Sequence, residues 1–273
     1  MVAFSFILIL HFPKYFYPSH ILICMVSEVL VNVNDVEISF LRGKDLPIVY
    51  VHGSGCDAKL WSYQLKGVGG YAIDLPNHGQ SYELEINSVD DYAYYVAEAV
   101  KKILDKAIFV GHSLGGAIVQ KVYLNHKKIV KALILVGTGV RLRVLPTLLE
   151  ELRNNPKKAV DTIVNMAFDR KVGEFEEIKE AFLENSKVLL RDLEICDKFD
   201  LLDDYKNGKI RIDMPTLIIV GNKDRLTPVK YSEFLNKQIE GSKLVVLDGG
   251  HMIMLEQPER LNEVINEFVE NLI

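Results

Sequence analysis

The chain has 273 residues, of which 49% are apolar and 25% are charged, and its formal net charge is −5. This composition is typical of a globular protein with one large domain, or one domain with an insertion, and it excludes the disordered and fibrous classes. Lys and Arg residues never occur in runs longer than two. The basic surface of a nucleic-acid binder or a polybasic membrane patch is therefore absent, and we expect a small-molecule partner and no nucleic acid.

Residues 1–25 differ in composition from the rest of the chain. The apolar run in "MVAFSFILIL" is too short to cross a bilayer and lacks the basic start and small-residue cleavage site of a secretory signal. We favour the interpretation that Met25 is a natural start and that the extension has no role in the fold. A membrane-touching anchor and a peptide that packs on the domain stay open as alternatives. We expect no stable membrane insertion and a cytoplasmic location.

The three cysteines, Cys24, Cys56 and Cys196, are an odd number at wide spacing. This pattern fits neither a disulfide framework nor a C-x-x-C metal site. A reducing compartment is expected, and no metal site is predicted.

From residue 29 onward the apolar pattern becomes regular. "VLVNVN" and "VEISFL" alternate apolar and polar residues around Asn34 and Asp35, which predicts a β-hairpin. Six continuous apolar runs then predict buried strands: "LPIVYVHGSG", "GGYAIDLPNHG", "KAIFVGHS", "KALILVGTG", "PTLIIVGNKD" and "KLVVLDGGH". Amphipathic helical stretches separate most of them. The prediction is an α/β fold whose mostly parallel sheet has about eight strands, antiparallel at its N-terminal edge, flanked by helices.

One segment, residues 140–212, interrupts this alternation. It has helical spacing throughout and predicts an insertion of three or four helices after the sixth strand. The core is accordingly assigned to residues 26–139 and 213–273, and the insertion to a helical cap or lid. An insertion that follows the carboxyl end of a strand must lie over that edge of the sheet, where the chemistry of such sheets occurs.

Five strand ends carry recognisable loops: "HGSG", "DLPNHGQS", "GHSLGG", "GNKDRLTP" and "DGGHMIMLEQPE". In this order they resemble the α/β-hydrolase superfamily, in its serine-nucleophile, cap-bearing branch of esterases, lactonases and C–C bond hydrolases. The resemblance extends from about residue 29 to the C-terminus. It implies the α/β-hydrolase fold and hydrolysis without a metal or an organic cofactor.

Ser113 stands where the third of these loops turns a strand abruptly into a helix. Gly111 and Gly115 leave space at such a turn, and Gly116 lets the helix pack closely. The resemblance makes Ser113 the nucleophile. The alternative is a serine that only caps the helix.

His251 is the residue to which we assign the role of general base and then general acid. It follows a buried strand and two glycines, in a segment that resembles the catalytic-histidine loop of the family. His52, His112 and His78 lie in the other loops, where we expect them to shape turns through hydrogen bonds.

Asp224 is the expected acid, because it lies at a strand end between the serine and the histidine in chain order. Asp248 is its main rival, but it ends the same strand that precedes His251 and is expected to serve the turn. Asp74 is the other candidate, and a role in bracing its loop is the stronger interpretation.

The resemblance also implies an oxyanion hole made of the main-chain N–H groups of Ser54 and Leu114. A side chain on Gly53 would push this loop away. Cys56 follows closely and is interpreted as a small residue that lines the pocket rather than a reactive thiol.

Together these residues predict a carboxylic ester hydrolase that works through an acyl-enzyme on a small acyl substrate. Hydrolysis of an enol-lactone or of a C–C bond in a diketo acid is the alternative within the fold. For the diketo acid, Arg141, Arg143 and Arg225 are candidate cationic pocket residues. A serine at position 113, and a single tyrosine (Tyr205) in the insertion, disfavour the aspartate-nucleophile epoxide hydrolases. A ligand-binding protein without turnover also stays open, as does a homodimer.

Overall fold

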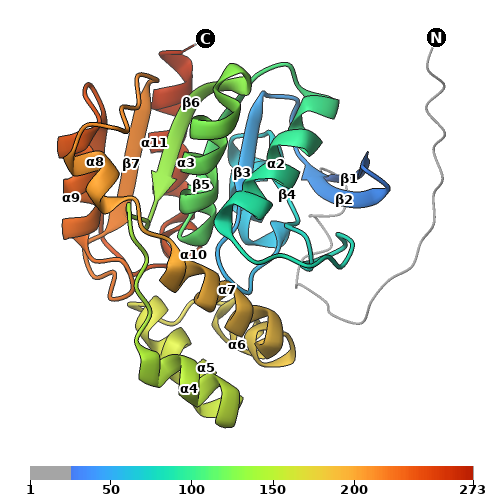
Figure 1. Cartoon of the computed structure of the whole chain (residues 1–273), viewed down its shortest axis with the longest axis vertical. Helices are drawn as coiled ribbons and strands as arrows, with labels where there is room; N and C mark the ends of the chain where they lie inside the picture. The colour runs from blue at the N-terminus through green and yellow to red at the C-terminus, as the bar shows by residue number, and fades with distance from the viewer. Residues whose placement is uncertain (1–25, 273) are drawn as a thin grey trace.

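The computed structural model describes residues 26–272, which form one sheet between layers of helices (Figure 1). The sheet has eight strands in the order β1-β2-β4-β3-β5-β6-β7-β8. The strands are β1 Ser27–Val33, β2 Val36–Arg42, β3 Ile48–Val51, β4 Tyr71–Ile73, β5 Ala107–His112, β6 Val130–Val136, β7 Thr216–Gly221 and β8 Lys243–Leu247. Only β1 with β2 and β2 with β4 pair antiparallel, and the other pairs are parallel. The predicted architecture, with its antiparallel N-terminal edge, is confirmed.

The helices are α1 Ser62–Gly67, α2 Val89–Ile103, α3 Leu114–His126, α4 Pro146–Asn154, α5 Pro156–Ala167, α6 Phe175–Glu184, α7 Ser186–Lys198, α8 Leu202–Lys206, α9 Val229–Gln238, α10 Ile253–Glu256 and α11 Pro258–Glu270, with short 3-10 segments at Ala58–Trp61 and Lys127–Ile129. Helices α1, α8 and α10 were not predicted from the sequence. These helices have only four to six residues, too few for an apolar period to emerge.

The hairpin between β1 and β2 turns at Asn34 and Asp35, whose φ angles are 51° and 67°. Positive φ at both central residues is the geometry of a type I′ turn, whose twist matches that of the strands it joins. Asn and Asp tolerate this conformation better than other side chains. The hairpin predicted from sequence is therefore confirmed.

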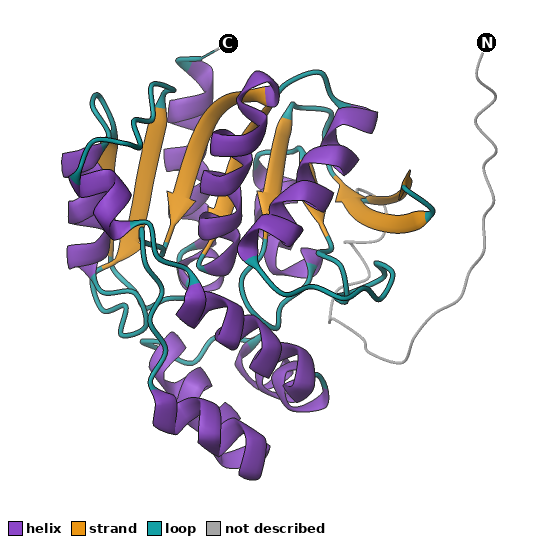
Figure 2. Ribbon diagram, in the orientation of Figure 1, coloured by secondary structure: helices purple, strands orange, loops and turns teal. Residues whose placement is uncertain are grey.

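The strands β3 to β7 are buried on both faces, and alternate residues enter opposite cores. The prediction of a buried strand is wrong for β8, which lies at the edge of the sheet with only Leu247 buried and Val246 46% exposed. In β5, Phe109 belongs to the core that contains α2 and α3, whereas Ile108 and Val110 belong to the core that contains α1 and α11. Figure 2 shows the sheet enclosed by helices on both faces. A continuous apolar run is what such two-sided burial requires.

The five helices α4 to α8 lie between β6 and β7 in the chain. Figure 1 shows α4 to α7 beyond the ends to which the strand arrows point. This segment thus contains five helices where three or four were expected, because the short α8 has no readable apolar period. Among residues 26–272, no helix has both the length and the apolar character needed to cross a membrane. Residues 1–25, for which a start at Met25 was predicted, lie outside the described part of the chain.

Candidate active site

Ser113 occupies the turn between β5 and α3 with φ 54° and ψ −116°. This left-handed conformation is strained for any residue other than glycine. The turn is held on both sides, because the Ser113 N–H donates to Val136 O at 3.0 Å and the Thr138 hydroxyl donates to Ser113 O at 2.8 Å. The main chain therefore fixes where the Ser113 hydroxyl points.

Three glycines let the strand, the turn and the helix approach one another. A Cβ on Gly115 would lie 2.2 Å from Val51 O, and one on Gly111 would lie 2.3 Å from Gly115 O. A Cβ on Gly116 would lie 2.4 Å from Thr138 Cγ2. Distances this short exclude any side chain at these positions without a shift of the backbone or of its neighbour.

Asp224 and His251 meet at the carboxyl ends of the neighbouring strands β7 and β8. Their side chains are buried, and His251 Nδ1 lies 2.8 Å from Asp224 Oδ2. The Thr227 hydroxyl donates to the same oxygen at 2.8 Å, and Asp224 Oδ1 accepts the main-chain N–H groups of Leu226 and Thr227. The structure thus brings together two of the three predicted residues, and both carboxylate oxygens of Asp224 accept hydrogen bonds.

Electrostatics keep Asp224 ionised. Burial would raise the pKa of this carboxyl, but the facing His251 and the hydrogen bonds from Thr227 outweigh burial and lower it. With Nδ1–H directed at the carboxylate, Nε2 of His251 is the nitrogen available to accept a proton. Ser113 and His251 line the same cavity, and within residues 26–272 no hydrogen bond joins their side chains.

The loop that carries His251 is fastened to the insertion. Ala167 O, at the end of α5, accepts the main-chain N–H groups of His251 at 2.7 Å and Met252 at 3.2 Å. Glu256 accepts the N–H of Gly250 at 3.0 Å. The contacts of Glu256, Ala167 and the Thr227 hydroxyl were not predicted from the sequence, since they depend on how distant loops pack and leave no local pattern.

Two further histidines near the site, His52 and His112, are buried and neutral and bond the main chain of neighbouring loops. His52 Nε2 accepts the Leu75 N–H at 3.1 Å, so its Nδ1–H donates to Gly53 O at 2.9 Å, and burial lowers its pKa to about 3. His112 Nε2 donates to His251 O at 3.1 Å, and burial, aided by His251, lowers its pKa well below the usual range. Both side chains thus join neighbouring loops through hydrogen bonds.

The main-chain groups of Ser54 and Leu114 are the predicted oxyanion donors. In the described part of the chain neither N–H donates to another residue, and Leu114 is the first residue of α3, whose N-terminal end attracts negative charge. A Cβ on Gly53 would lie 3.2 Å from Ser113 Cβ and 2.9 Å from His112 Nδ1. The loop can approach the serine this closely because residue 53 is a glycine.

A cavity of about 320 Å³ opens over Ser113 and His251. The chain between β6 and β7 supplies much of its apolar wall: Leu145, Leu148, Ile163, Met166, Phe182 and Leu193. Cys56 also lines it, as predicted from sequence, and burial raises the pKa of its thiol, so the reactive thiolate is disfavoured. Among residues 26–272, no group of three or more His, Cys, Asp or Glu side chains could hold a metal ion.

The chain matches the model of the alpha/beta hydrolase family over residues 48–264. The protein belongs to the α/β-hydrolase family. A solved structure of a thermophilic esterase is 52% identical to it with a TM-score of 0.90, and the match covers 91% of this chain and 99% of that one.

Two curated α/β hydrolases are more distant relatives. The AB hydrolase superfamily protein YisY of Bacillus subtilis is 27% identical over 263 residues, covering 83% of this chain and 92% of that protein. The pimeloyl-(acyl-carrier protein) methyl ester esterase of Vibrio vulnificus is 24% identical over 241 residues, covering 80% and 92%.

The rival carboxylates of this α/β hydrolase lie elsewhere. Asp248 is exposed and pairs with Arg170 at 2.9 Å and Lys223 at 3.3 Å. Asp74 accepts the main-chain N–H groups of Ala58 at 2.8 Å and Gln80 at 2.9 Å, so it braces its own loop. Neither carboxylate contacts the His251 side chain in the described part of the chain.

Proposed function

We propose that this α/β hydrolase cleaves carboxylic esters through a covalent acyl-enzyme on Ser113, with His251 and Asp224 completing a catalytic triad. Esterases among the relatives, above all the one that is 52% identical, support a hydrolase that acts on esters. The observation that carries the assignment of residues is the buried pair of His251 and Asp224, joined at 2.8 Å beside the strained Ser113 turn.

In the proposed first step, Ser113 Oγ attacks the ester carbonyl and His251 Nε2 takes its proton. The imidazolium is stabilised by Asp224, which the hydrogen bonds from Thr227 keep ionised. His251 then gives the proton to the departing alcohol. In the second step it activates a water that releases the acid and restores Ser113.

The negative charge that develops on the carbonyl oxygen needs donors that are already in place. The unpaired main-chain N–H groups of Ser54 and Leu114 are suited to this, and the N-terminal end of α3 adds its dipole. Because both donors belong to the main chain, their positions depend on Gly53 and on the Ser113 turn rather than on the identity of the side chain at residue 54.

For the substrate we propose short to medium apolar acyl groups. The volume of about 320 Å³ is small for a ligand cavity, which commonly measures about 300–1,000 Å³, and the wall from the insertion is apolar. Long acyl chains would exceed it. In this proposal α4 to α7 act as the cap that excludes bulk water, whereas α8 packs on the core through Tyr205 and Gln120.

An ester is favoured over a diketo acid because the candidate cations are already bonded. Arg143 bonds Asp200 at 3.1 Å and Asp197 O at 2.7 Å, and Arg225 donates to Phe168 O at 2.7 Å. Arg141 is absent from the cavity wall and lies near Asp200 instead. A substrate carboxylate would have to displace these partners.

The test is turnover of p-nitrophenyl acetate, butyrate, octanoate and palmitate, alongside an enol-lactone and a diketo acid. We expect kcat/KM to be highest for the short and medium esters and to fall steeply at palmitate. A preference for the diketo acid or the lactone would replace the ester assignment. If no acyl compound is turned over, the protein would instead be one that binds a ligand without hydrolysing it.

A further inference from the structure

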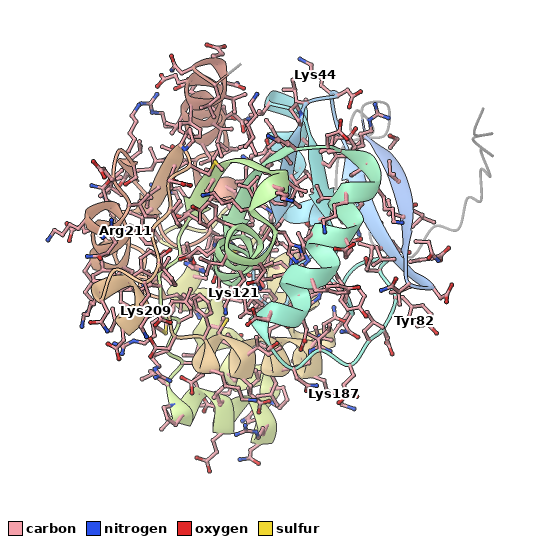
Figure 3. All side chains as sticks on the ribbon, turned by 45° about the horizontal axis from the view of Figure 1, so that its top comes forward. Lys44, Tyr82, Lys121, Lys187, Lys209 and Arg211 are labelled. Atoms are coloured by element: carbon pink, nitrogen blue, oxygen red, sulfur yellow. The ribbon has the colours of Figure 1, made fainter. Side chains whose placement is uncertain are left out.

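Helix α7 places one buried face against the loop that carries the Ser54 N–H. The residues Leu189, Asp192 and Cys196 recur at helical spacing, so they share that face. Cys196 Sγ lies 3.5 Å from Ser54 Oγ, and a Cβ on Gly55 would lie 2.9 Å from Leu189 Cδ1. Lys187 of the same helix lies at the outer surface (Figure 3). The helix therefore acts as a backing for residues 54 and 55.

Asp192 is the polar centre of this face. It is fully buried and accepts three hydrogen bonds from three separate parts of the core: the Gly55 N–H at 3.0 Å, His78 Nε2 at 2.9 Å and the Tyr92 hydroxyl at 2.7 Å. The Arg191 guanidinium lies 3.8 Å away and donates to the same Tyr92 oxygen at 3.2 Å. A buried carboxylate is tolerated only with such partners, so these contacts define one position of α7 on the core.

His78 meets Asp192 as a cation. Its Nδ1 bonds Pro76 O at 3.0 Å while Nε2 bonds the carboxylate, and two acceptors require a proton on both nitrogens. Burial opposes this charge, but Asp192 raises the pKa of His78 overall. Burial likewise opposes the Asp192 charge, but His78 and the other donors lower its pKa. Hydrogen bonds to ionised groups are about twice as strong as neutral ones, which strengthens the hold on Gly55.

Within residues 53–56 the loop is closed by a single long hydrogen bond, from the Cys56 N–H to Gly53 O at 3.3 Å, and His52 Nδ1 also donates to Gly53 O. The loop contains glycines at positions 53 and 55. Gly55 has φ 68°, and because glycine has no side chain, its backbone could adopt many other conformations if nothing held it. The Gly55 N–H belongs to the peptide unit that follows Ser54, so fixing it fixes the main chain on the carboxyl side of the proposed oxyanion donor.

We infer that Asp192 is a positioning residue that holds the Ser54 N–H in the oxyanion hole by anchoring Gly55 to α7. The inference rests on the proposed function. Since α7 belongs to the insertion between β6 and β7, the anchor exists only while this helix lies on the core. The position of the proposed oxyanion donor thus depends on the position of α7.

The test compares Asp192→Ala and Asp192→Asn with the matched control Glu194→Gln. Glu194 is on the same helix but pairs with Arg153 of α4, away from the loop. The readouts are kcat and KM for p-nitrophenyl butyrate and the affinity for a trifluoromethyl ketone, whose adduct carries the oxyanion. Loss of one oxyanion donor lowers kcat about 100- to 1,000-fold, so a displaced donor in Asp192→Ala should cost at least about tenfold.

Asp192→Asn keeps an acceptor oxygen but loses the charge, and should recover most of the loss, leaving kcat about threefold below the wild type. KM should stay within about threefold in both variants, inhibitor affinity should fall in step with kcat, and Glu194→Gln should match the wild type. Unchanged kcat and inhibitor affinity, or an effect on KM alone, would overturn the inference. If Asp192→Ala does not fold, Asp192→Asn decides by the same criteria. If the wild type itself does not turn over the ester, the proposed function is wrong, and this outcome is distinct from a failure of the inference about Asp192.

Discussion

His251 Nδ1 lies 2.8 Å from Asp224 Oδ2, and the Thr227 hydroxyl contacts both atoms, at 3.2 Å and 2.8 Å. These contacts fix the imidazole ring and its tautomer, leaving Nε2 free to accept a proton. Asp248, only three residues from His251 in sequence, is turned to the surface and bonded to Arg170. The two aspartates therefore have opposite expected roles.

Asp224→Asn should lower kcat by about three to four orders of magnitude, because the amide holds the wrong tautomer of His251. Asp248→Asn is the matched control and should keep most of the activity, since it loses only exposed ion pairs. Steady-state kinetics with p-nitrophenyl butyrate separates the two. Greater loss in Asp248→Asn would move the acid to that residue.

The Ser113 turn should cost stability in the wild type. Strain at a left-handed residue amounts to about 1–3 kcal/mol, and glycine relieves it. Ser113→Gly should therefore melt a few degrees above Ser113→Ala, although both lack the hydroxyl. Thermal melts of the two variants test this, and an equal or lower melting temperature for the glycine variant would show that the turn is not strained.

Gly115→Ala should destabilise the fold by about 3 kcal/mol or more, since its Cβ would meet Val51 O at 2.2 Å and neither backbone can move freely. Gly173→Ala is the control, because a Cβ there has nothing within 4 Å. Chemical denaturation measures both. Equal stability of the two variants would mean that β3 and α3 can separate at no cost.

His52 should make stability fall as the pH decreases below about 6.5, because the unfolded chain protonates this residue while the folded chain keeps it neutral down to a pKa of about 3. The slope is about 1.4 kcal/mol for each pH unit and each such group. His112 acts in the same direction, whereas His78, whose pKa is raised, and Asp74, whose pKa burial raises to about 6, act in the opposite one. His52→Gln should flatten the dependence of melting temperature between pH 7 and pH 5. An unchanged slope would assign acid sensitivity to other groups.

The sequence was sufficient to place the residues of the proposed triad at strand ends. Ser113, Asp224 and His251 lie in the loops that follow β5, β7 and β8, whose apolar runs are readable in the sequence, and parallel strands bring those ends to one edge. The sequence does not predict contacts that depend on packing between distant segments. Asp192 and Gly55 are separated by 137 positions, and nothing near either residue indicates the other. Arg141 was a candidate for the pocket, but Asp200 holds it outside the cavity wall.

The central claim is that Ser113 is a nucleophile activated by His251, and covalent labelling by a fluorophosphonate tests it most directly. Intact-protein and peptide mass spectrometry should find one label per chain, on the peptide that contains Ser113, with ester turnover lost in proportion to labelling. Ser113→Ala should take no label and lose turnover. Labelling elsewhere, or a wild type that hydrolyses esters while Ser113 stays unmodified, would contradict the account.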